Sequence, residues 1–300
     1  EPPKALGKGT EWGLYAVGVA AVGACWWMVQ NQSVVGSLLG LSGAVLVGYV
    51  LFTAVVKLEP HDRDRIFAAM FLIIGSILFW ALFEQAGSSL NLYTDRYVDR
   101  GGVPASVFQS INAIYIVLLA PLFATLWTWL GRRGLEPSAP AKFGLALMQL
   151  GGGFLVLVAG AATGDMTPVL FIFLIYLLHT TGELCLSPVG LSAMNRLAPA
   201  HMASLIMGTW FFASATGNFA AGLIAAATGS EAASGEGAAK EVVLGVYNQI
   251  GWVAIGVGVG VLVVSPLIKK LMHLDTLKDD TTLAADGMDE AYPVAARPAE

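Results

Sequence analysis

Eight long apolar stretches dominate this sequence and constrain its fold more than any other feature. Each stretch holds roughly 20 mostly apolar residues, the length that an α-helix needs to cross the hydrocarbon core of a membrane. Short polar segments separate the stretches, which lie at 12–30, 34–56, 66–93, 107–130, 143–163, 168–194, 203–228 and 242–268. The sequence therefore predicts an all-α membrane protein with eight transmembrane helices embedded in a lipid bilayer.

The scarcity of charge supports this prediction. Only 12% of the 300 residues are charged and 56% are hydrophobic, whereas an average soluble domain carries roughly twice that charged fraction. The net charge is −5 and no basic stripe is present, so nucleic acid is not expected as a partner. The two cysteines, Cys25 and Cys185, have no metal-ligand spacing, and we expect no metal site.

The basic residues are divided unevenly between the two sides that eight spans define. An even number of spans places both termini on the same side, and the side richer in Lys and Arg is usually cytoplasmic. Of the 16 basic residues, Arg96, Arg100 and Lys240 fall on the far side and the other 13 on the side of the termini. We therefore predict that both termini are cytoplasmic.

Two carboxylates lie deep inside predicted spans: Glu84 in the third and Glu183 in the sixth. An ionised group at the centre of a membrane helix costs about 3 kcal/mol or more, so such residues are candidates for function. Neither has a basic partner at helical spacing. His179 lies four residues before Glu183, on the same helix face. It either shares a proton or hydrogen bond with Glu183 or is a neutral histidine bonded to nearby backbone.

The two glutamates occupy equivalent positions if the last six spans are divided three and three. In transporters built from inverted three-helix repeats, equivalent helices line one central cavity, and Glu84 and Glu183 would then face the same water-filled space. The alternative is coincidence. Asn112, near the start of the fourth span, is a further cavity candidate, whereas Gln149 and Asn218 fit interhelical hydrogen bonding.

Enzyme motifs are absent from the sequence. It contains no GxSxG elbow, HExxH, P-loop or dinucleotide fingerprint. Ser187 and His179 are eight residues apart on one predicted helix, too far for a bond between a nucleophile and its base. We expect no catalytic residues and do not expect an enzyme.

Two segments resemble a known family. The first is FWALFEQAGSSLNLYTDR (79–96), which resembles the first helix of the C-terminal half of the proton-dependent oligopeptide transporters, a family of the major facilitator superfamily. The second is GELCLSPVGLSAMNRLAPAHMASLIMGTWFFASATGNFAAG (182–222), which resembles that family's tenth and eleventh helices with their cytoplasmic loop. The first two spans look like the additional hairpin of bacterial members.

The resemblance implies a domain organisation in a bacterial inner membrane. It comprises a cytoplasmic linker at 1–11, the additional transmembrane hairpin at 12–57, a six-helix C-terminal bundle at 58–273 and a disordered cytoplasmic tail at 274–300. The family's Glu-x-x-Glu-Arg motif, found on the first helix of its N-terminal half, does not occur in this sequence. The sequence thus resembles a C-terminal half, and we expect an N-terminal six-helix half as its partner.

The resemblance also implies a function: proton-coupled symport of di- and tripeptides by alternating access, with no cofactor and with protons as the coupling ion. Glu183 would bind the peptide amino terminus with help from Asn112, and Ser187 would line the same site. Glu84 would pair with a lysine of the other half and, with Glu183, take part in proton coupling. Trp210 would wall a side-chain pocket.

Two alternatives to peptide transport remain open at this point. The protein could carry another solute of the same family, such as nitrate or a peptidomimetic. It could instead be a structural membrane module that assembles with another subunit.

Overall fold

The computed structural model describes residues 7–229 and 240–274. Eight helices in these ranges are long and apolar enough to cross a membrane, as predicted. The predicted linker at 1–11 lies outside the described residues up to position 6, and its last four residues are helical because the first helix begins at Lys8. The predicted tail lies outside the described residues from position 275 onward.

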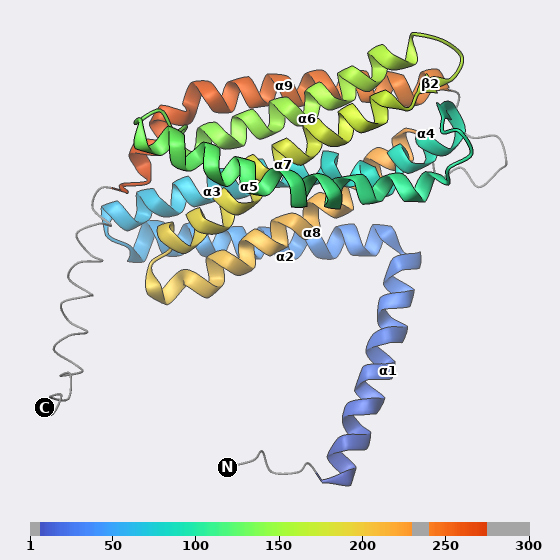
Figure 1. Ribbon diagram of the computed structural model, residues 1–300. Helices are drawn as coiled ribbons and strands as arrows, with labels where there is room; N and C mark the ends of the chain where they lie inside the picture. Colours follow the sequence, from blue (N-terminus) through green and yellow to red (C-terminus); the bar gives the residue numbers. More distant parts are fainter. Residues whose placement is uncertain (1–6, 230–239, 275–300) are drawn as a thin grey trace, which may run out of the picture. The chain divides into compact units, whose positions relative to one another are not determined.

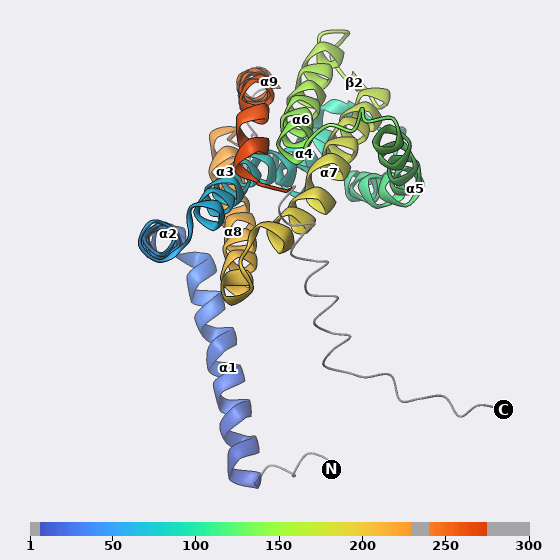
Figure 2. The same ribbon diagram turned by 90° about the vertical axis from the view of Figure 1, so that its left-hand side faces the viewer.

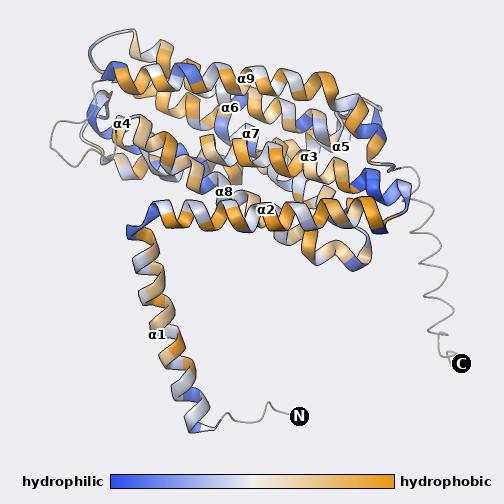
Figure 3. Cartoon of the chain, turned by 180° about the vertical axis from the view of Figure 1, so that it is seen from behind, coloured by the Kyte–Doolittle hydropathy of each residue, from blue (hydrophilic) through white to orange (hydrophobic). Residues whose placement is uncertain are grey.

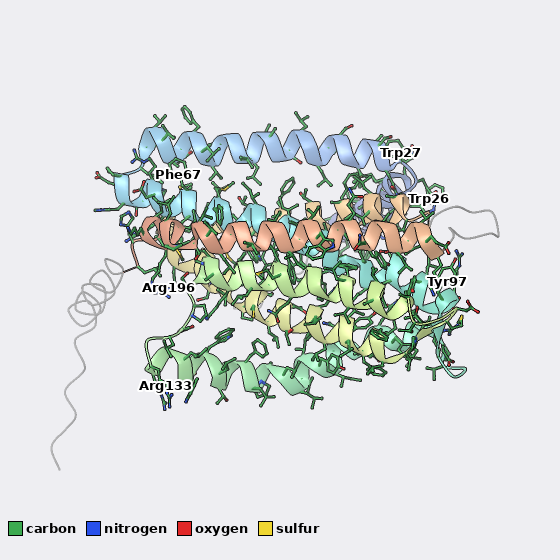
Figure 4. The ribbon with its side chains drawn as sticks, turned by 90° about the horizontal axis from the view of Figure 1, so that it is seen from above. Trp26, Trp27, Phe67, Tyr97, Arg133 and Arg196 are labelled. Atoms are coloured by element: carbon green, nitrogen blue, oxygen red, sulfur yellow. The ribbon has the colours of Figure 1, made fainter. Side chains whose placement is uncertain are left out.

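The chain divides into two compact units between Val50 and Leu51. The first unit contains helix α1 (Lys8–Gln30) and most of helix α2 (Gln32–Lys57), with Asn31 between them. Aromatic residues stand near both ends of α1: Trp12 and Tyr15 at its start, and Trp26 and Trp27, labelled in Figure 4, at its end. Such aromatic residues are typical of the two interfaces between a membrane and water.

The second unit contains six transmembrane spans that run side by side (Figures 1 and 2). The first span is broken into α3 (Pro60–Phe83), the 3₁₀ turn η1 (Glu84–Gly87) and α4 (Ser89–Tyr97). The others are α5 (Ser110–Arg132), preceded by η2 (Ala105–Gln109), then α6 (Ala139–Ala161), α7 (Leu170–Leu197), α8 (Ala203–Ala227), preceded by η3 (Ala200–Met202), and α9 (Lys240–Leu271). The prediction of an all-α fold is thus confirmed, apart from a two-residue parallel pairing of β1 (Val98–Asp99) with β2 (Thr167–Pro168).

The helix boundaries extend the predicted spans by a few polar residues, and local sequence explains where they fall. Proline is favoured in the first turn of a helix, where its missing N–H would have no partner, and α3 begins at Pro60. Ser138 caps α6, because its Oγ accepts a hydrogen bond from the backbone N–H of Ala141 at 3.4 Å. Apolar residues fill the helix middles and polar ones gather at the ends (Figure 3).

A close backbone contact joins α6 and α9. A Cβ atom on Gly151 would lie 2.5 Å from the carbonyl oxygen of Gly251, and one on Gly258 would lie 2.7 Å from that of Gly144. No side chain fits at these positions, so glycine allows the two backbones to meet. These four glycines therefore serve helix packing.

The two ends of the six-helix unit differ in their polar residues. Arg133 and Arg196 lie at one end and Tyr97 at the other (Figure 4). At the Tyr97 end, Lys240 Nζ donates hydrogen bonds of 3.0–3.1 Å to the carbonyl oxygens of Ala161, Gly164 and Asp165. A lysine in this place satisfies carbonyl groups left free where α6 ends.

Candidate functional site

A polar cluster lies between α5 and α7. Asn112, in the first turn of α5, donates from Nδ2 to the carboxylate Oε2 of Glu183 at 3.0 Å and to Thr180 Oγ1 at 3.1 Å. Thr180 in turn donates to the backbone oxygen of Tyr176 at 2.7 Å. The structure therefore brings together two predicted site residues that are 71 positions apart. Thr180 was not predicted as a site residue, although it lies three residues before Glu183 and so shares its helix face.

Glu84 stands where the first span of the six-helix unit breaks. It is the first residue of the 3₁₀ turn that separates α3 from α4, whereas the sequence predicted one continuous span at 66–93. The Glu84 side chain is half-buried and, within residues 7–229 and 240–274, makes no hydrogen bond or ion pair. The preceding residue, Phe83, lies 6.2 Å between ring centroids from His179 of α7, the helix that also carries Glu183.

A buried network holds the break beside Glu84. Gln85 has no exposed surface. Its Nε2 donates to the carbonyl oxygens of Ala81 at 3.0 Å and Ala221 at 3.1 Å, which ties the break to α8. Ser89 Oγ donates to Gln85 Oε1 at 2.6 Å and lies 2.8 Å from the hydroxyl of Tyr247 on α9. Polar side chains at the break are thus hydrogen-bonded within the protein, as a membrane interior requires.

Replacing Gln85 by leucine should lower the thermal stability of the protein in detergent. Leucine has a similar volume but leaves the Ala81 and Ala221 carbonyl oxygens without the amide donor, at a cost of about 1–3 kcal/mol. Melting followed by circular dichroism measures the change. Gln249→Leu is the matched control, because Gln249 is exposed. Equal melting of the two variants would show that the Gln85 network does not stabilise the break.

The other predicted residues differ in their surroundings. Ser187 is half-buried and lies one turn after Glu183 on α7. Trp210 on α8 is only 3% exposed. Its ring fills the space over Gly190 of α7 and meets Phe143 edge to face, with 6.2 Å between the ring centroids. This is a packing contact, and a role for Trp210 as the wall of a substrate pocket stays a prediction.

His179 is buried among aromatic rings rather than bonded to Glu183. It is 1% exposed, and the ring of Phe154 lies 4.9 Å away between centroids. Its polar neighbour is the backbone of Leu150, but neither ring nitrogen makes a well-aligned hydrogen bond to any described residue. Of the two interpretations, the neutral histidine beside backbone fits better than a shared hydrogen bond with Glu183.

Neither Glu84 nor Glu183 forms an ion pair with a cation in the described part of the chain, and the ion pairs found there involve other residues. Nor do the described residues contain a group of histidine, cysteine and carboxylate side chains arranged to hold a metal ion. The carboxylate of Glu183 can therefore accept hydrogen bonds from an ammonium group. The carboxylate of Glu84 has no ion-pair partner among the described residues.

Comparison with known proteins identifies the family. A family model described as the POT family matches residues 23–253, which is most of the chain. The chain belongs to the POT family. This POT-family protein is a multi-pass membrane protein of a transporter family.

Relatives of this POT-family chain include proteins named as peptide transporters. "Peptide transporter YePEPT" of Yersinia enterocolitica is 38% identical over 205 residues, which is 65% of this chain and 40% of the relative. "Dipeptide and tripeptide permease B" of Salmonella typhimurium is 28% identical over 263 residues, or 85% of this chain and 54% of the relative.

Solved structures of the family have the same fold. A crystal structure of a mutant of the peptide transporter POT matches with a TM-score of 0.70 and 29% identity, covering 88% of this chain and 54% of that one. The chain thus spans about half the length of the relatives it matches.

Proposed function

We propose that this chain supplies the C-terminal half of the binding cavity of a proton-coupled symporter for di- and tripeptides. The observation that carries the proposal is the pairing of Asn112 with Glu183 inside the bundle, at 3.0 Å. Two relatives, named a peptide transporter and a dipeptide and tripeptide permease, support it. The complete cavity then lies between this bundle and an N-terminal six-helix half.

The Glu183 cluster suits the amino terminus of a peptide. A peptide ammonium group donates three hydrogen bonds, and a carboxylate accepts them with charge assistance. Asn112 presents its Nδ2 to Glu183 and Thr180, so its amide oxygen remains available to accept from the same ammonium group. Ser187, one turn along α7, extends the polar surface toward the peptide backbone.

Glu84 serves proton coupling in this proposal. Its carboxylate has no cation among the described residues, and we infer that a lysine of the N-terminal half pairs with it in one conformation. Protonation removes the carboxylate charge and breaks the pair, so that a proton shifts the balance between two conformations. Protons are then the coupling ion, and no cofactor takes part. The 3₁₀ turn that begins at Glu84 gives the span a place to bend.

The membrane placement follows the distribution of basic residues. Arg133 and Arg196 lie at one end of the bundle (Figure 4), and this is the end that the positive-inside rule assigns to the cytoplasm. We propose that the protein resides in a bacterial inner membrane with both termini of the chain in the cytoplasm.

Uptake by the full-length protein in proteoliposomes tests the proposed function. An inward proton gradient should drive accumulation of labelled dialanine, and collapse of the gradient by an ionophore should stop it. Excess unlabelled tripeptide should compete, whereas nitrate should not. Competition by nitrate but not by peptide would show that the substrate is another solute, such as nitrate, and not a peptide. Failure to transport any of these solutes would favour a structural module.

Replacing Glu84 by glutamine should impair coupling more than binding. Glutamine cannot be deprotonated, so the pair with a lysine no longer responds to protons. We expect proton-driven uptake to fall about tenfold, as expected for the loss of about 1.4 kcal/mol, while exchange of internal for external peptide without a gradient persists. A variant that fails to insert or to fold would instead give Glu84 a structural role.

A further inference from the structure

A pocket of about 440 Å³ lies at the Arg196 end of the bundle, where α5, α7 and α9 end and α6 begins. Its wall includes Trp127, Glu136, Lys142, Ser192, Arg196 and Lys269. None of the residues assigned above to substrate or proton coupling lines it. The pocket is therefore a second site, and what it binds does not depend on the proposed transport function.

One cation of the pocket is fixed in the wall. Lys142 is only 5% exposed. Its Nζ forms an ion pair with Glu136 Oε1 and lies 4.2 Å from the centroid of the Trp127 ring. Both contacts are shielded by the side chain's burial, so they hold the ammonium group in one place.

The other two cations are free to bind a ligand. Arg196 and Lys269 line the same pocket and are exposed. Neither makes an ion pair with any residue the structure describes. With Glu136 neutralised by Lys142, the wall carries an excess positive charge from Arg196 and Lys269, and an anion is the complementary ligand.

Hydroxyl groups and apolar side chains complete the wall. Ser138 Oγ accepts from the backbone N–H of Ala141, so its own hydroxyl proton can be donated to a ligand oxygen. The hydroxyl of Ser192 also lines the pocket, as do the apolar side chains of Val189 and Leu274. Hydroxyl donors can bind the phosphate oxygens of a ligand, and the apolar side chains beside them can contact a glycerol backbone attached to that phosphate. A fully hydrated ion would make no use of the apolar side chains.

We propose that this pocket binds the phosphate of an anionic phospholipid headgroup. Basic pockets between transmembrane helices at the membrane surface bind such headgroups. A guanidinium matches the phosphate oxygens in bidentate geometry, which assigns the principal contact to Arg196. Lys269 adds a second charge and Ser138 a hydroxyl donor. The ligand comes from the membrane rather than from solution, because the pocket lies at the level where the apolar lengths of α5, α7 and α9 end.

Native mass spectrometry of the delipidated full-length protein tests this proposal. The protein is titrated with cardiolipin, and with phosphatidylcholine of the same acyl chains. The double variant Arg196→Gln with Lys269→Gln should bind cardiolipin at least about tenfold more weakly, since it removes both basic side chains of the pocket that make no ion pair with a described residue. Its binding of phosphatidylcholine should not change.

A second double variant controls for the general attraction of anionic lipid to basic ends of helices. Arg132→Gln with Lys270→Gln removes the same charge at the same end of the bundle, from residues outside the pocket wall. It should bind cardiolipin nearly as tightly as the unmodified protein. Equal weakening in the two double variants would overturn the proposal, because the attraction would then be general.

One further variant and a competition experiment with inorganic phosphate complete the test. Lys269→Arg retains the charge and should retain cardiolipin binding, so loss of binding by this variant would contradict the assignment. Millimolar inorganic phosphate should leave bound cardiolipin in place. Displacement of the lipid by inorganic phosphate would assign the pocket to a soluble anion and overturn the lipid proposal.

Discussion

Proton-driven uptake of dialanine is expected to fall about 100-fold when Glu183 is replaced by glutamine in the full-length protein. The glutamine amide keeps the size of the side chain and can still bond to Asn112, which lies 3.0 Å from the carboxylate. It removes the negative charge that faces the peptide ammonium group. A hydrogen bond to a charged group contributes about 1.5–3 kcal/mol, and the upper part of this range corresponds to about 100-fold.

The matched control is Glu59→Gln. Glu59 precedes the first turn of α3, is exposed and makes no capping hydrogen bond with its side chain. Its replacement should leave uptake unchanged. Binding of dialanine measured by calorimetry separates recognition from coupling, because Glu183→Gln should weaken binding itself. Uptake by Glu183→Gln at the unmodified rate would remove Glu183 from the substrate site.

Replacing Gly151 by valine should have the largest effect on stability. A Cβ atom there would lie 2.5 Å from the backbone oxygen of Gly251 and 3.0 Å from the side chains of Ala254 and Ile255. The backbone oxygen cannot turn away, so α6 and α9 must separate. We expect a loss of about 3 kcal/mol and a melting temperature in detergent about 10 °C lower, or failure to accumulate in the membrane.

The neighbouring Gly152 provides the control. Nothing lies within 4 Å of a Cβ atom at Gly152, although it belongs to the same GGG run. Gly152→Ala should leave the melting temperature unchanged or raise it slightly, because alanine favours the helix by about 1 kcal/mol over glycine. If both variants melt alike, the contact between α6 and α9 does not limit stability.

Hydrophobic length and charge were enough to predict the eight spans. Each span has to satisfy its own backbone hydrogen bonds in lipid, so any apolar run of that length becomes a helix whatever its neighbours are. The 3₁₀ turn at 84–87 was not predicted, because it depends on contacts with other helices and not on the apolar length of its own span. Gln85 is polar and could have been placed in a continuous helix. It stabilises a turn only because Ala221 of α8 and Ser89 are within hydrogen-bonding distance.

The site residues likewise divide into those that the sequence singles out and those whose contacts only the structure reveals. The sequence alone singled out Glu84 and Glu183, because an ionisable group inside an apolar span is costly and therefore rare. The resemblance implied that Asn112 assists Glu183, and the structure shows the hydrogen bond between them. The resemblance implied that Trp210 walls a side-chain pocket, and the structure adds that its ring packs against Gly190 and Phe143.

The few charges of this sequence thus determined that the chain spans a membrane, and the uneven division of its basic residues predicted which end of each helix faces the cytoplasm. Both conclusions rest on the free energy of moving single residues between water and lipid, and this free energy depends on residue type rather than on tertiary contacts. Only the tertiary structure decided that Asn112 meets Glu183 and that Arg196 and Lys269 share one pocket. These pairings join residues far apart in the sequence, and they depend on how neighbouring helices pack.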